Sequence, residues 1–543
     1  MPQQTRFTFP SAFNETLKKY PGKNAYSFAG EKPLTWQQVN SRILSVMSFL
    51  ERNGIKPGDR VAILSQNMPE WPLAFFAVTF MGAVAVPVLP EFSSTEVTNV
   101  LEHSGTKAVF VSASLLNRVA PSNHNSLKLV ITIEDFGISW SAEHAAELVY
   151  PSVPAGNYTV EEDDLASIIY TSGTTGRSKG VMLTHKNITF NALMGGRIQP
   201  IDENDRFLSV LPLSHTYENT LGLILPLLYG SCVYYLRKPP TPAILLPALE
   251  QVKPTMMLTV PLIIEKVYFN KILPKFRDSK LLSSLYKFSA MRRFLNVTAG
   301  KKLMKTFGGQ LKFFGIGGAK LNPAVEKFLI EARFPYAVGY GLTESSPLLA
   351  GSNPQNTILE GIGPAIQEIE LKINDPDPET GEGEIWARGP NIMKGYYLEP
   401  EMTSETITPD GWLKTGDLGV FDEKGNLFIK GRLKNMILSS TGENIYPEEI
   451  ESIINNFRYV VESLVIEQKG KLVALVHLNM EELEKKYHSF RDDMGQKKEE
   501  FLNEIRNYVN SQVNKFSRIQ KVMIQREPFQ KTATLKIKRF LYK

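Results

Sequence analysis

A loop rich in glycine and hydroxyl side chains separates two apolar runs. It extends from Thr171 to Gly180, between Leu165–Tyr170 and Val181–Leu183. Glycines let backbone N–H groups converge on an anion, and hydroxyls add short hydrogen-bond donors. Its lysine precedes a glycine and its flanks indicate strands, so it is not a Walker A loop. The pattern predicts phosphate binding by a strand–loop–strand unit, although composition alone also allows an ordinary surface loop.

Four further polar residues lie in short motifs downstream. His215 follows a Leu-Pro-Leu-Ser turn, Glu344 and Asp417 each end a glycine-containing run, and Lys536 lies in a basic C-terminal run. An ionised carboxylate only accepts hydrogen bonds, which suits sugar hydroxyls, and it is a ligand for hard cations. Taken alone, each motif also fits a structural origin: a core histidine, a helix cap or a solvated basic tail.

Taken together and in this order, the motifs resemble those of the adenylate-forming (AMP-binding) superfamily, and most closely its long-chain fatty-acid–CoA ligases. The resemblance covers most of the chain. It implies an ATP/AMP site made by Thr171, Ser172, Gly173, Thr174, Thr175, Gly176, Lys179, Gly318, Ala319, Tyr340, Gly341, Thr343, Asp417, Arg432 and Lys536.

The resemblance also implies roles for single residues. Tyr340 would stack on adenine, Asp417 would accept hydrogen bonds from the ribose hydroxyls, and Thr343 would contact the α-phosphate. Glu344 would help to hold Mg²⁺. His215 would lie beside the substrate carboxylate.

Residues of the C-terminal part are implied to move between two reaction steps. Lys536 would bridge the carboxylate and the phosphates, where a flexible point charge suits a mobile domain. Leu535 replaces the family's usual glycine, so Lys538 stays open as the alternative lysine. Lys434 occupies the hinge position. The CoA channel would be bordered by Thr441 and Gly442.

The implied reaction is ATP-dependent activation of a carboxylic acid, which we take to be a medium- or long-chain fatty acid. The acyl-AMP would then pass to the thiol of coenzyme A, with Mg²⁺ assisting and AMP and pyrophosphate released. Three alternatives remain: ligation to an acyl-carrier-protein or release of acyl-AMP onward, luciferase-like oxidation, and a non-catalytic nucleotide- or lipid-binding protein. No nucleic-acid partner is expected.

The elements that must position these residues follow an α/β pattern. At 543 residues the chain exceeds a single core, and short apolar runs such as 60–65, 107–111 and 129–133 alternate with helical patterns. We expect a large N-terminal domain with mainly parallel sheets flanked by helices, and a small mobile α+β C-terminal domain. The expected divisions are an adenylation domain over 1–431, a hinge at 432–434 and a C-terminal domain over 435–543.

Two apolar stretches have alternative explanations. Cys232 is the only cysteine, and its apolar surroundings favour a core position over a nucleophile. The uncharged run 71–90 is long enough to span a membrane, but Gly82, Pro87 and Pro90 favour a helix followed by a buried strand. No signal peptide is evident at the start of the chain, so we expect a cytoplasmic protein.

The charge distribution is uneven although the formal net charge is only +5. Residues 266–305 contain eleven Lys or Arg and one acid, Asp278, with Leu, Phe, Tyr and Met between them. Such a run is either a solvated helical face or a contact for an anionic membrane surface. Peripheral attachment at the inner membrane face is therefore an open possibility.

Overall fold

Short apolar runs separated by helices form parallel strands, as the sequence predicts. The computed structural model describes residues 6–121, 125–143, 145–154, 156–172, 178–438, 444–468, 470–486, 496–532 and 537–542. The three runs near residues 60, 108 and 129 are β3 (Arg60–Leu64), β5 (Ala108–Val111) and β6 (Leu129–Thr132), and they pair in parallel. Strands buried on both faces by crossover helices have this continuous apolar pattern. The α/β fold class is confirmed.

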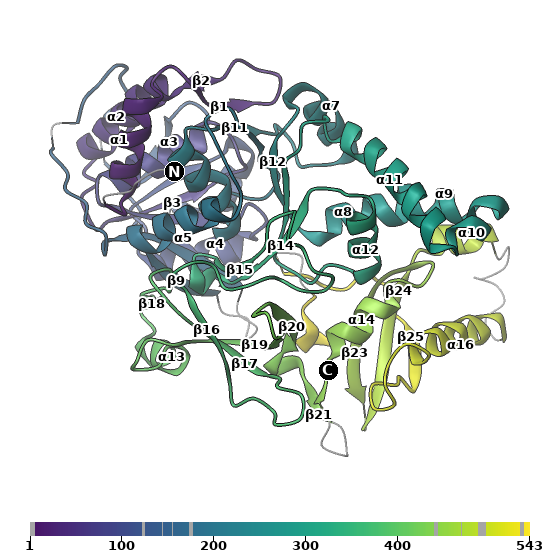
Figure 1. The fold of residues 1–543 in the computed structure, drawn as a ribbon. Coiled ribbons are helices and arrows are strands. Elements are labelled where there is room, and N and C mark those ends of the chain that lie inside the picture. Colours follow the sequence, from purple (N-terminus) through teal and green to yellow (C-terminus); the bar gives the residue numbers. More distant parts are fainter. Residues whose placement is uncertain are drawn as a thin grey trace.

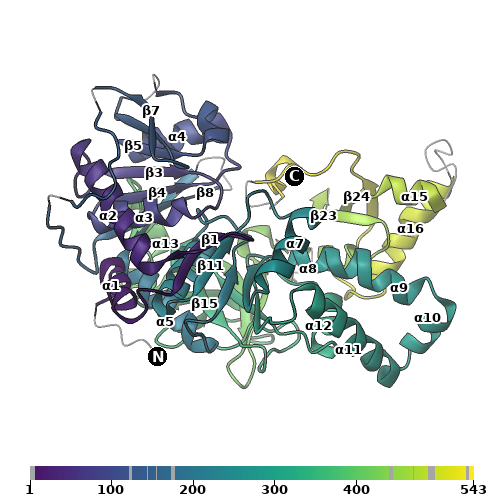
Figure 2. The same cartoon turned by 90° about the horizontal axis from the view of Figure 1, so that it is seen from above.

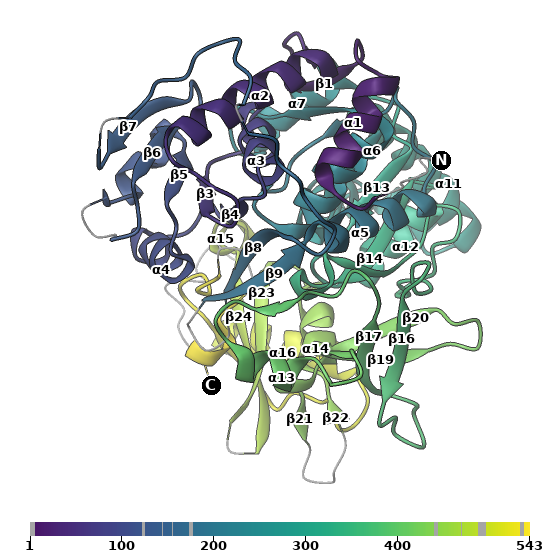
Figure 3. The same ribbon diagram turned by 90° about the vertical axis from the view of Figure 1, so that its left-hand side faces the viewer.

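One eight-stranded sheet contains these strands and the phosphate-loop hairpin (Figures 1 and 3). The strands β8 (Leu165–Ser172) and β9 (Ser178–Thr184) pair antiparallel on either side of residues 173–177, so the two predicted strands that flank this segment are confirmed. In spatial order the sheet contains β18 (Gly395–Tyr396), β9 (Ser178–Thr184), β8 (Leu165–Ser172), β4 (Val84–Val88), β3, β5, β6 and β7 (Gly137–Ser141).

A second eight-stranded sheet supplies the edge at which most of the candidate residues gather. Its central strands run parallel, and its two outermost pairs are antiparallel. In spatial order it contains β15 (Leu348–Gly351), β14 (Tyr336–Gly341), β13 (Phe313–Ile316), β12 (Met256–Thr259), β10 (Arg206–Leu208), β11 (Cys232–Tyr235), β1 (Asn24–Phe28) and β2 (Leu34–Thr35). The carboxyl ends of its parallel strands share one edge, where ligands of α/β folds bind.

Helices cover both sheets and fill the space between them. The run 71–90 is α3 (Glu70–Phe80) followed by β4, and nearly all of it is buried, as expected for a helix–strand unit. Cys232 lies buried on β11. The other helices near these sheets are α1 (Phe9–Lys19), α2 (Trp36–Arg52), α4 (Ser94–Ser104), α5 (His185–Ile198) and α6 (Leu225–Tyr229). Among the helices described, none is both long and apolar enough to cross a membrane.

A further group of helices extends from the second sheet to the edge of the molecule (Figure 2). Apolar side chains of α7 (Pro242–Val252), α8 (Pro261–Val267) and α12 (Pro323–Glu331) pack on its strands in a continuous cluster. The group consists of α7 (Pro242–Val252), α8 (Pro261–Val267), α9 (Leu273–Arg277), α10 (Lys280–Tyr286), α11 (Ser289–Thr306) and α12 (Pro323–Glu331).

A four-stranded antiparallel sheet leads from the large sheets to the C-terminal part. It contains β16 (Glu370–Asn374), β17 (Gly383–Arg388), β19 (Leu413–Phe421) and β20 (Leu427–Arg432), and α13 (Pro400–Thr406) lies beside it. The acidic, proline-containing run near 375–383 forms the loop between β16 and β17, as expected. After β20 the chain makes one short 3₁₀ turn, Leu433–Asn435.

The C-terminal part has a hydrophobic cluster of its own between a small sheet and its helices. The sheet contains β23 (Val460–Gln468), β24 (Lys471–Leu478) and β25 (Lys521–Ile524), and a two-stranded ribbon, β21 (Ile437–Leu438) and β22 (Asn444–Ile445), precedes it. The helices are α14 (Pro447–Ile454), α15 (Met480–Lys486) and α16 (Gln496–Asn510). A separate core is what permits a domain to move as a unit.

Candidate active site

Tyr340 and Asp417 meet at the carboxyl edge of the second sheet. Tyr340 is the penultimate residue of β14, and its hydroxyl donates to Asp417 Oδ2 on β19 at 2.9 Å. Arg432 pairs with Asp417 in the β19–β20 register, and its Nε lies 3.0 Å from Asp417 Oδ1. Burial, and then the adjacent Asp417 carboxylate, raise the pKa of Tyr340 well above its usual value. Three residues predicted for the ATP/AMP site are therefore joined in one cluster, in which Tyr340 and Asp417 are buried and Arg432 is partly exposed.

Thr343 and Glu344 form a single 3₁₀ turn directly after β14. The chain can turn here because Gly341 lies against the backbone of Pro347, where a Cβ atom would overlap the Pro347 carbonyl oxygen. Glu344 Oε1 accepts a hydrogen bond from the Tyr396 hydroxyl at 2.8 Å. Burial, and then Glu344, raise the pKa of Tyr396, which stays protonated and orients the carboxylate.

Tyr396 also connects this turn to the predicted phosphate loop. Thr171 and Lys179 face each other across the β8–β9 hairpin. The Lys179 ammonium lies 5.1 Å from the centroid of the Tyr396 ring, within the range of a cation–π contact. Lys179 therefore lies over the ring of the same tyrosine whose hydroxyl binds Glu344, so the loop lysine and the proposed metal ligand lie in one region.

The segment around His215 packs on the glycine-rich segment after β13. Tyr217 covers Gly315 and Gly317, where an added Cβ would lie 3.2 and 3.1 Å from the tyrosine ring or hydroxyl. Gly318 has φ +85°, a conformation that favours glycine. His215 Nδ1 accepts the backbone N–H of Tyr217 at 3.2 Å. Since Nδ1 is an acceptor, the Nε2 atom carries the ring proton in neutral His215.

An internal cavity of about 50 Å³ extends behind Tyr217, between α5 and the second sheet. The register of β13 and β14 pairs Gly315 with Ala337, so Gly339 lies two residues nearer the carboxyl edge and Phe313 two residues farther from it. The cavity is otherwise almost wholly apolar. Its polar side chains beyond Tyr217 are Gln199 and Ser352, which are 8% and 7% exposed, and each has a buried oxygen with no hydrogen-bond partner among the described residues.

Glu218 is a buried carboxyl group that the sequence did not single out. It begins a π-helical turn, Glu218–Ile224, directly after the His215 motif. Its Oε2 has no hydrogen-bond partner within the described structure. Burial raises the pKa of Glu218 to about 8, against a lowering contribution from Ser209. Glu218 is therefore neutral over most of the physiological pH range.

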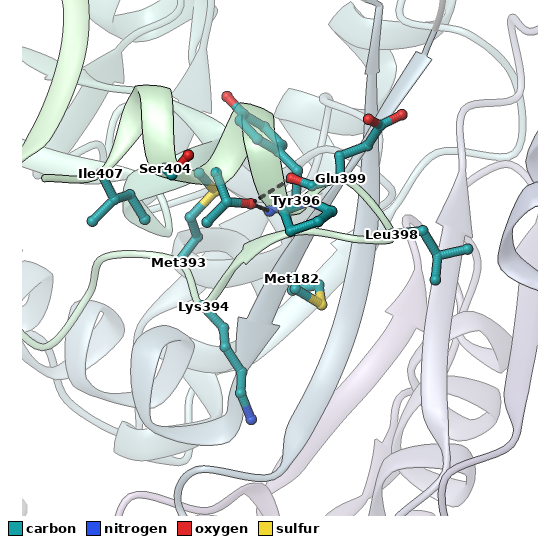
Figure 4. Close-up of a pocket in the computed structure, with 10 residues that line it drawn as sticks. Met182, Met393, Lys394, Tyr396, Leu398, Glu399, Ser404 and Ile407 are labelled. Atoms are coloured by element: carbon teal, nitrogen blue, oxygen red, sulfur yellow. Dashed lines mark hydrogen bonds between the residues drawn. The ribbon is translucent and has the colours of Figure 1, made fainter. Parts of the chain in front are cut away.

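A larger outer pocket of about 610 Å³ lies beside β18 and α13 (Figure 4). Tyr396 lines it, and Lys394 and Glu399 stand at its sides. None of the residues predicted for ATP, the acid or CoA lines this pocket, so its size alone does not make it the substrate site.

The Glu344 carboxylate is a suitable ligand for Mg²⁺. Within the described ranges, no three His, Cys, Asp or Glu side chains come together as a metal cluster. Glu344 offers one carboxylate next to the hydroxyl of Thr343. One hard-oxygen ligand is sufficient for a Mg²⁺ ion that takes its other ligands from phosphate oxygens and water.

Several predicted site residues lie outside the described residues, and their geometry is not assigned: Gly173, Thr174, Thr175, Gly176, Thr441, Gly442 and Lys536. The alternative lysine, Lys538, is described, and its backbone N–H donates to the Gln530 carbonyl at 2.8 Å. Lys434 is exposed in the 3₁₀ turn after β20.

The sequence missed Tyr396, Glu218, Gln199 and Ser352. Tyr396 lies in a two-residue strand 52 residues after Glu344, and no local pattern connects them. A glutamate next to an apolar run would have suggested a buried acid, but such patterns more often place the charge at the surface. The serine and glutamine lie at the ends of elements, where their burial depends on tertiary packing.

Fold and site together define a nucleotide-binding α/β protein with a small separate C-terminal domain. Residues 13–397 match the family model described as AMP-binding enzyme, and residues 434–541 match the model of the AMP-binding enzyme C-terminal domain. The chain belongs to the AMP-binding enzyme family, the adenylate-forming superfamily.

Curated relatives are similar over most of the chain but differ in their named acids. The chain is 29% identical to long-chain-fatty-acid–CoA ligase heimdall of Drosophila melanogaster, covering 82% of this chain and 72% of that protein. It is 30% identical to 4-coumarate–CoA ligase 1 of Solanum tuberosum, covering 82% and 80%. The solved structure of o-succinylbenzoate CoA synthetase from Bacillus subtilis with its acyl-adenylate has the same fold, with a TM-score of 0.78 at 23% identity over 98% of both chains.

Proposed function

We propose that this protein is an ATP-dependent acid–CoA ligase that forms an acyl-adenylate and then a thioester. The observation that carries the proposal is the cluster of Tyr340, Asp417 and Arg432 beside the turn with Thr343 and Glu344. It supports a nucleoside at one end and phosphates at the other. The relatives that are CoA ligases support coenzyme A as the thiol.

In the first step, a carboxylate oxygen of the acid attacks the α-phosphorus of ATP. The bond to the bridging oxygen breaks, and pyrophosphate leaves with the electron pair. Thr343 and Lys536 would stabilise the charge on the phosphate, and Asp417 would hold the ribose. Mg²⁺, when bound at Glu344, supplies positive charge against the phosphates.

In the second step, the thiol sulfur attacks the acyl carbonyl, AMP leaves, and the thiol proton is lost. His215 would lie beside the carbonyl group in both steps. We propose 1–431 as the adenylation domain, 432–434 as the hinge and 435–543 as the mobile domain, with Thr441 and Gly442 along the CoA channel. Rotation of the mobile domain about Lys434 would remove Lys536 from the active site and bring the CoA channel to it.

We propose a medium- or long-chain fatty acid as the substrate. The cavity behind Tyr217 supports this choice because its lining is mainly apolar and it begins at the glycines next to the site. Two features of the cavity bear on which acid is the substrate. The cavity is small, at about 50 Å³, and Gln199 and Ser352 each contribute a buried oxygen that has no partner among the described residues. A chain that enters must widen the cavity.

Acid-dependent exchange of pyrophosphate into ATP, measured without CoA, tests this function. The panel would contain alkanoic acids of increasing length, their ω-hydroxy counterparts, 4-coumarate and o-succinylbenzoate. We expect exchange to be fastest with a medium- or long-chain alkanoic acid. Preference for an aromatic acid would reject the fatty-acid assignment. If none of the acids supports exchange, the ligase assignment itself is rejected.

The variants Gln199→Leu and Ser352→Ala test whether the acyl chain of the substrate is a simple alkyl chain or carries a polar end. If alkanoic acids are the substrates, removing two unpaired polar oxygens should leave their kcat/KM unchanged or raise it a few-fold, since burying an unpaired polar group against an alkyl chain is unfavourable. A loss confined to ω-hydroxy acids would instead identify the polar end of the acid as the recognised group. Leu398→Ser, which alters the outer pocket, is the matched control.

A further inference from the structure

Helix α10 and the N-terminal half of α11 form a projecting edge of the molecule, while the C-terminal half of α11 packs on the apolar cluster of the second sheet. Figures 1 and 2 both place α10 at the periphery, joined to the body through α9 and α11. α10 contains no buried residue at all, and α11 buries only Asn296, Gly300 and Leu303 over its 18 residues. The segment therefore offers a large surface that the rest of the described chain does not cover.

Three large apolar side chains are exposed on this edge. Leu281, Phe288 and Phe294 are 70%, 67% and 66% exposed, and they lie within fourteen residues of one another. Single exposed apolar residues need no explanation, but a group of them on one projecting element indicates an interaction surface.

The inner side of α11 packs its C-terminal half on an apolar cluster through Leu303 and makes paired polar contacts nearer its N-terminus. Arg292 binds Glu331 of α12 with Nη2–Oε1 at 2.9 Å, and Asn296 Nδ2 donates to the same carboxylate at 2.7 Å. Tyr286 of α10 donates to Asn296 Oδ1 at 3.0 Å. The helix is thus fixed by hydrogen bonds on its inner side, while Phe294 faces outwards. Arg292 belongs to this internal network and not to the exposed charge.

Positive charge surrounds the exposed apolar side chains. Phe294 and Lys301 are seven residues apart on α11 and so share one helix face. Asp278 is the only acid in this segment, and Glu331 of the adjoining helix is already occupied by Arg292. The exposed basic residues are Lys266, Lys271, Lys275, Arg277, Lys280, Lys287, Arg293, Lys301, Lys302 and Lys305.

We infer that α10 and α11 dock the protein on an anionic lipid surface. Leu281, Phe288 and Phe294 enter the boundary between headgroups and acyl chains, and the surrounding lysines contact lipid phosphates. The exposed phenylalanines favour a lipid surface over a soluble polyanion, which would engage the charges alone. The contact is peripheral. It holds whether or not the protein is a ligase, because it uses none of the site residues.

Co-sedimentation of the full chain with vesicles tests the inference. We expect binding to vesicles of phosphatidylglycerol and phosphatidylcholine at low salt, little binding to phosphatidylcholine alone, and release in about 1 M salt, where the Debye length falls to about 3 Å. Lys301→Glu with Lys302→Glu should lower the partition coefficient by at least tenfold, since each basic residue near such a surface contributes roughly fivefold.

The matched control changes net charge equally at another helix. Lys18→Glu with Lys19→Glu on α1 also alters the charge by four units, and it should leave the partition coefficient within about twofold. The circular dichroism spectrum and the thermal unfolding midpoint should be unchanged in both pairs, which shows that each variant is folded. Equal losses in the two pairs would mean that only net charge matters and would overturn the inference.

A second variant tests the apolar part of the contact. Leu281→Ser, Phe288→Ser and Phe294→Ser together should lower the partition coefficient by about tenfold or more, because exposed aromatic and aliphatic side chains supply interfacial burial. If vesicle binding survives this triple change but an RNA homopolymer competes it away, the surface binds polyanions and not lipid. Absence of binding to anionic vesicles at low salt would also overturn the inference.

Discussion

The Tyr340 hydroxyl donates a hydrogen bond to Asp417 Oδ2 at 2.9 Å, across 77 residues of sequence. Arg432 approaches the other oxygen, Oδ1, at 3.0 Å. The Asp417 carboxylate is thus contacted at one oxygen by Tyr340 and at the other by Arg432. Carboxylate oxygens each have two lone pairs, so Asp417 can still accept hydrogen bonds from ribose.

Tyr340→Phe should weaken ATP binding while keeping the aromatic ring. Hydrogen bonds to charged groups contribute about 1.5–3 kcal/mol, so we expect KM for ATP to rise about tenfold or more. The KM for the acid should change little, because Tyr340 does not line its cavity. Initial rates against ATP and against acid separate the two effects. An unchanged KM for ATP would show that Asp417 is not oriented through Tyr340.

Glu344→Gln should raise the Mg²⁺ concentration needed for half-maximal exchange, because an amide is a weaker ligand for a hard cation than a carboxylate. Tyr396→Phe keeps the carboxylate and removes only the 2.8 Å hydrogen bond that orients it. We therefore expect a smaller increase in that variant. Titration of Mg²⁺ at saturating ATP measures both. Equal metal requirements in wild type and Glu344→Gln would remove Glu344 from the metal site.

The C-terminal part contacts the large domain through Asn322 and Asn456. Asn322 Nδ2 donates to Asn456 Oδ1 at 2.7 Å and to the Ser452 carbonyl at 3.5 Å. Rotation about Lys434 would break this contact. Because Cys232 is the only native cysteine and is buried, Asn322→Cys with Asn456→Cys can be oxidised with little background.

We expect this cross-link to abolish one of the two half-reactions and to leave the other. Pyrophosphate exchange and thioester formation from supplied acyl-AMP are assayed before and after oxidation, with cross-linking verified by mass spectrometry. Reduction should restore the lost step. The Asn322→Cys single variant is the control. Full activity in both half-reactions of the cross-linked protein would refute a rotation between them.

Glu218→Gln should change how stability depends on pH. Below about pH 4.5, Glu218 is protonated in both the folded and the unfolded chain. Above it, the unfolded chain ionises, but the folded protein keeps the proton up to a pKa of about 8. The wild type therefore loses stability between these values, by up to a few kcal/mol since one pKa unit is about 1.4 kcal/mol. Above pH 8 the difference is constant.

Unfolding midpoints of the two proteins at pH 5 and pH 8 measure this effect. The unfolding midpoint of Glu218→Gln should rise relative to that of the wild type as the pH rises from 5 to 8. The nearby Tyr217 and Tyr235 have pKa values raised by burial and stay neutral over this range. Parallel curves for the two proteins would show that Glu218 is ionised in the folded state.

The parallel sheets could be predicted because each buried strand is a continuous apolar run. The site motifs could be predicted only through their resemblance to the adenylate-forming superfamily, because each motif taken alone also fits a structural origin. The sequence could not predict β18, since two residues carry no periodicity, and so it missed the contacts of Tyr396 with Lys179 and Glu344. The bond between Tyr340 and Asp417 depends on the meeting of two sheets, which neither motif encodes alone.

The sequence also could not predict which polar residues are buried. Glu218 follows a tyrosine in a segment that turns as a π-helix, and its depth results from packing with distant strands. For the basic segment the sequence left two explanations open. The structure adds that Arg292 is bound internally, while Phe288 and Phe294 are exposed.

The central claim is that one site adenylates an acid and passes the acyl group to a thiol. The most direct measurement follows ATP labelled at the α-phosphate, with the acid and coenzyme A, and quantifies nucleotide and thioester together. We expect AMP and acyl-CoA in equal amounts. Lys536→Ala should lower AMP formation by about 10²–10³ while sparing thioester formation from supplied acyl-AMP. Labelled ADP as the product, or AMP without thioester, would contradict the account.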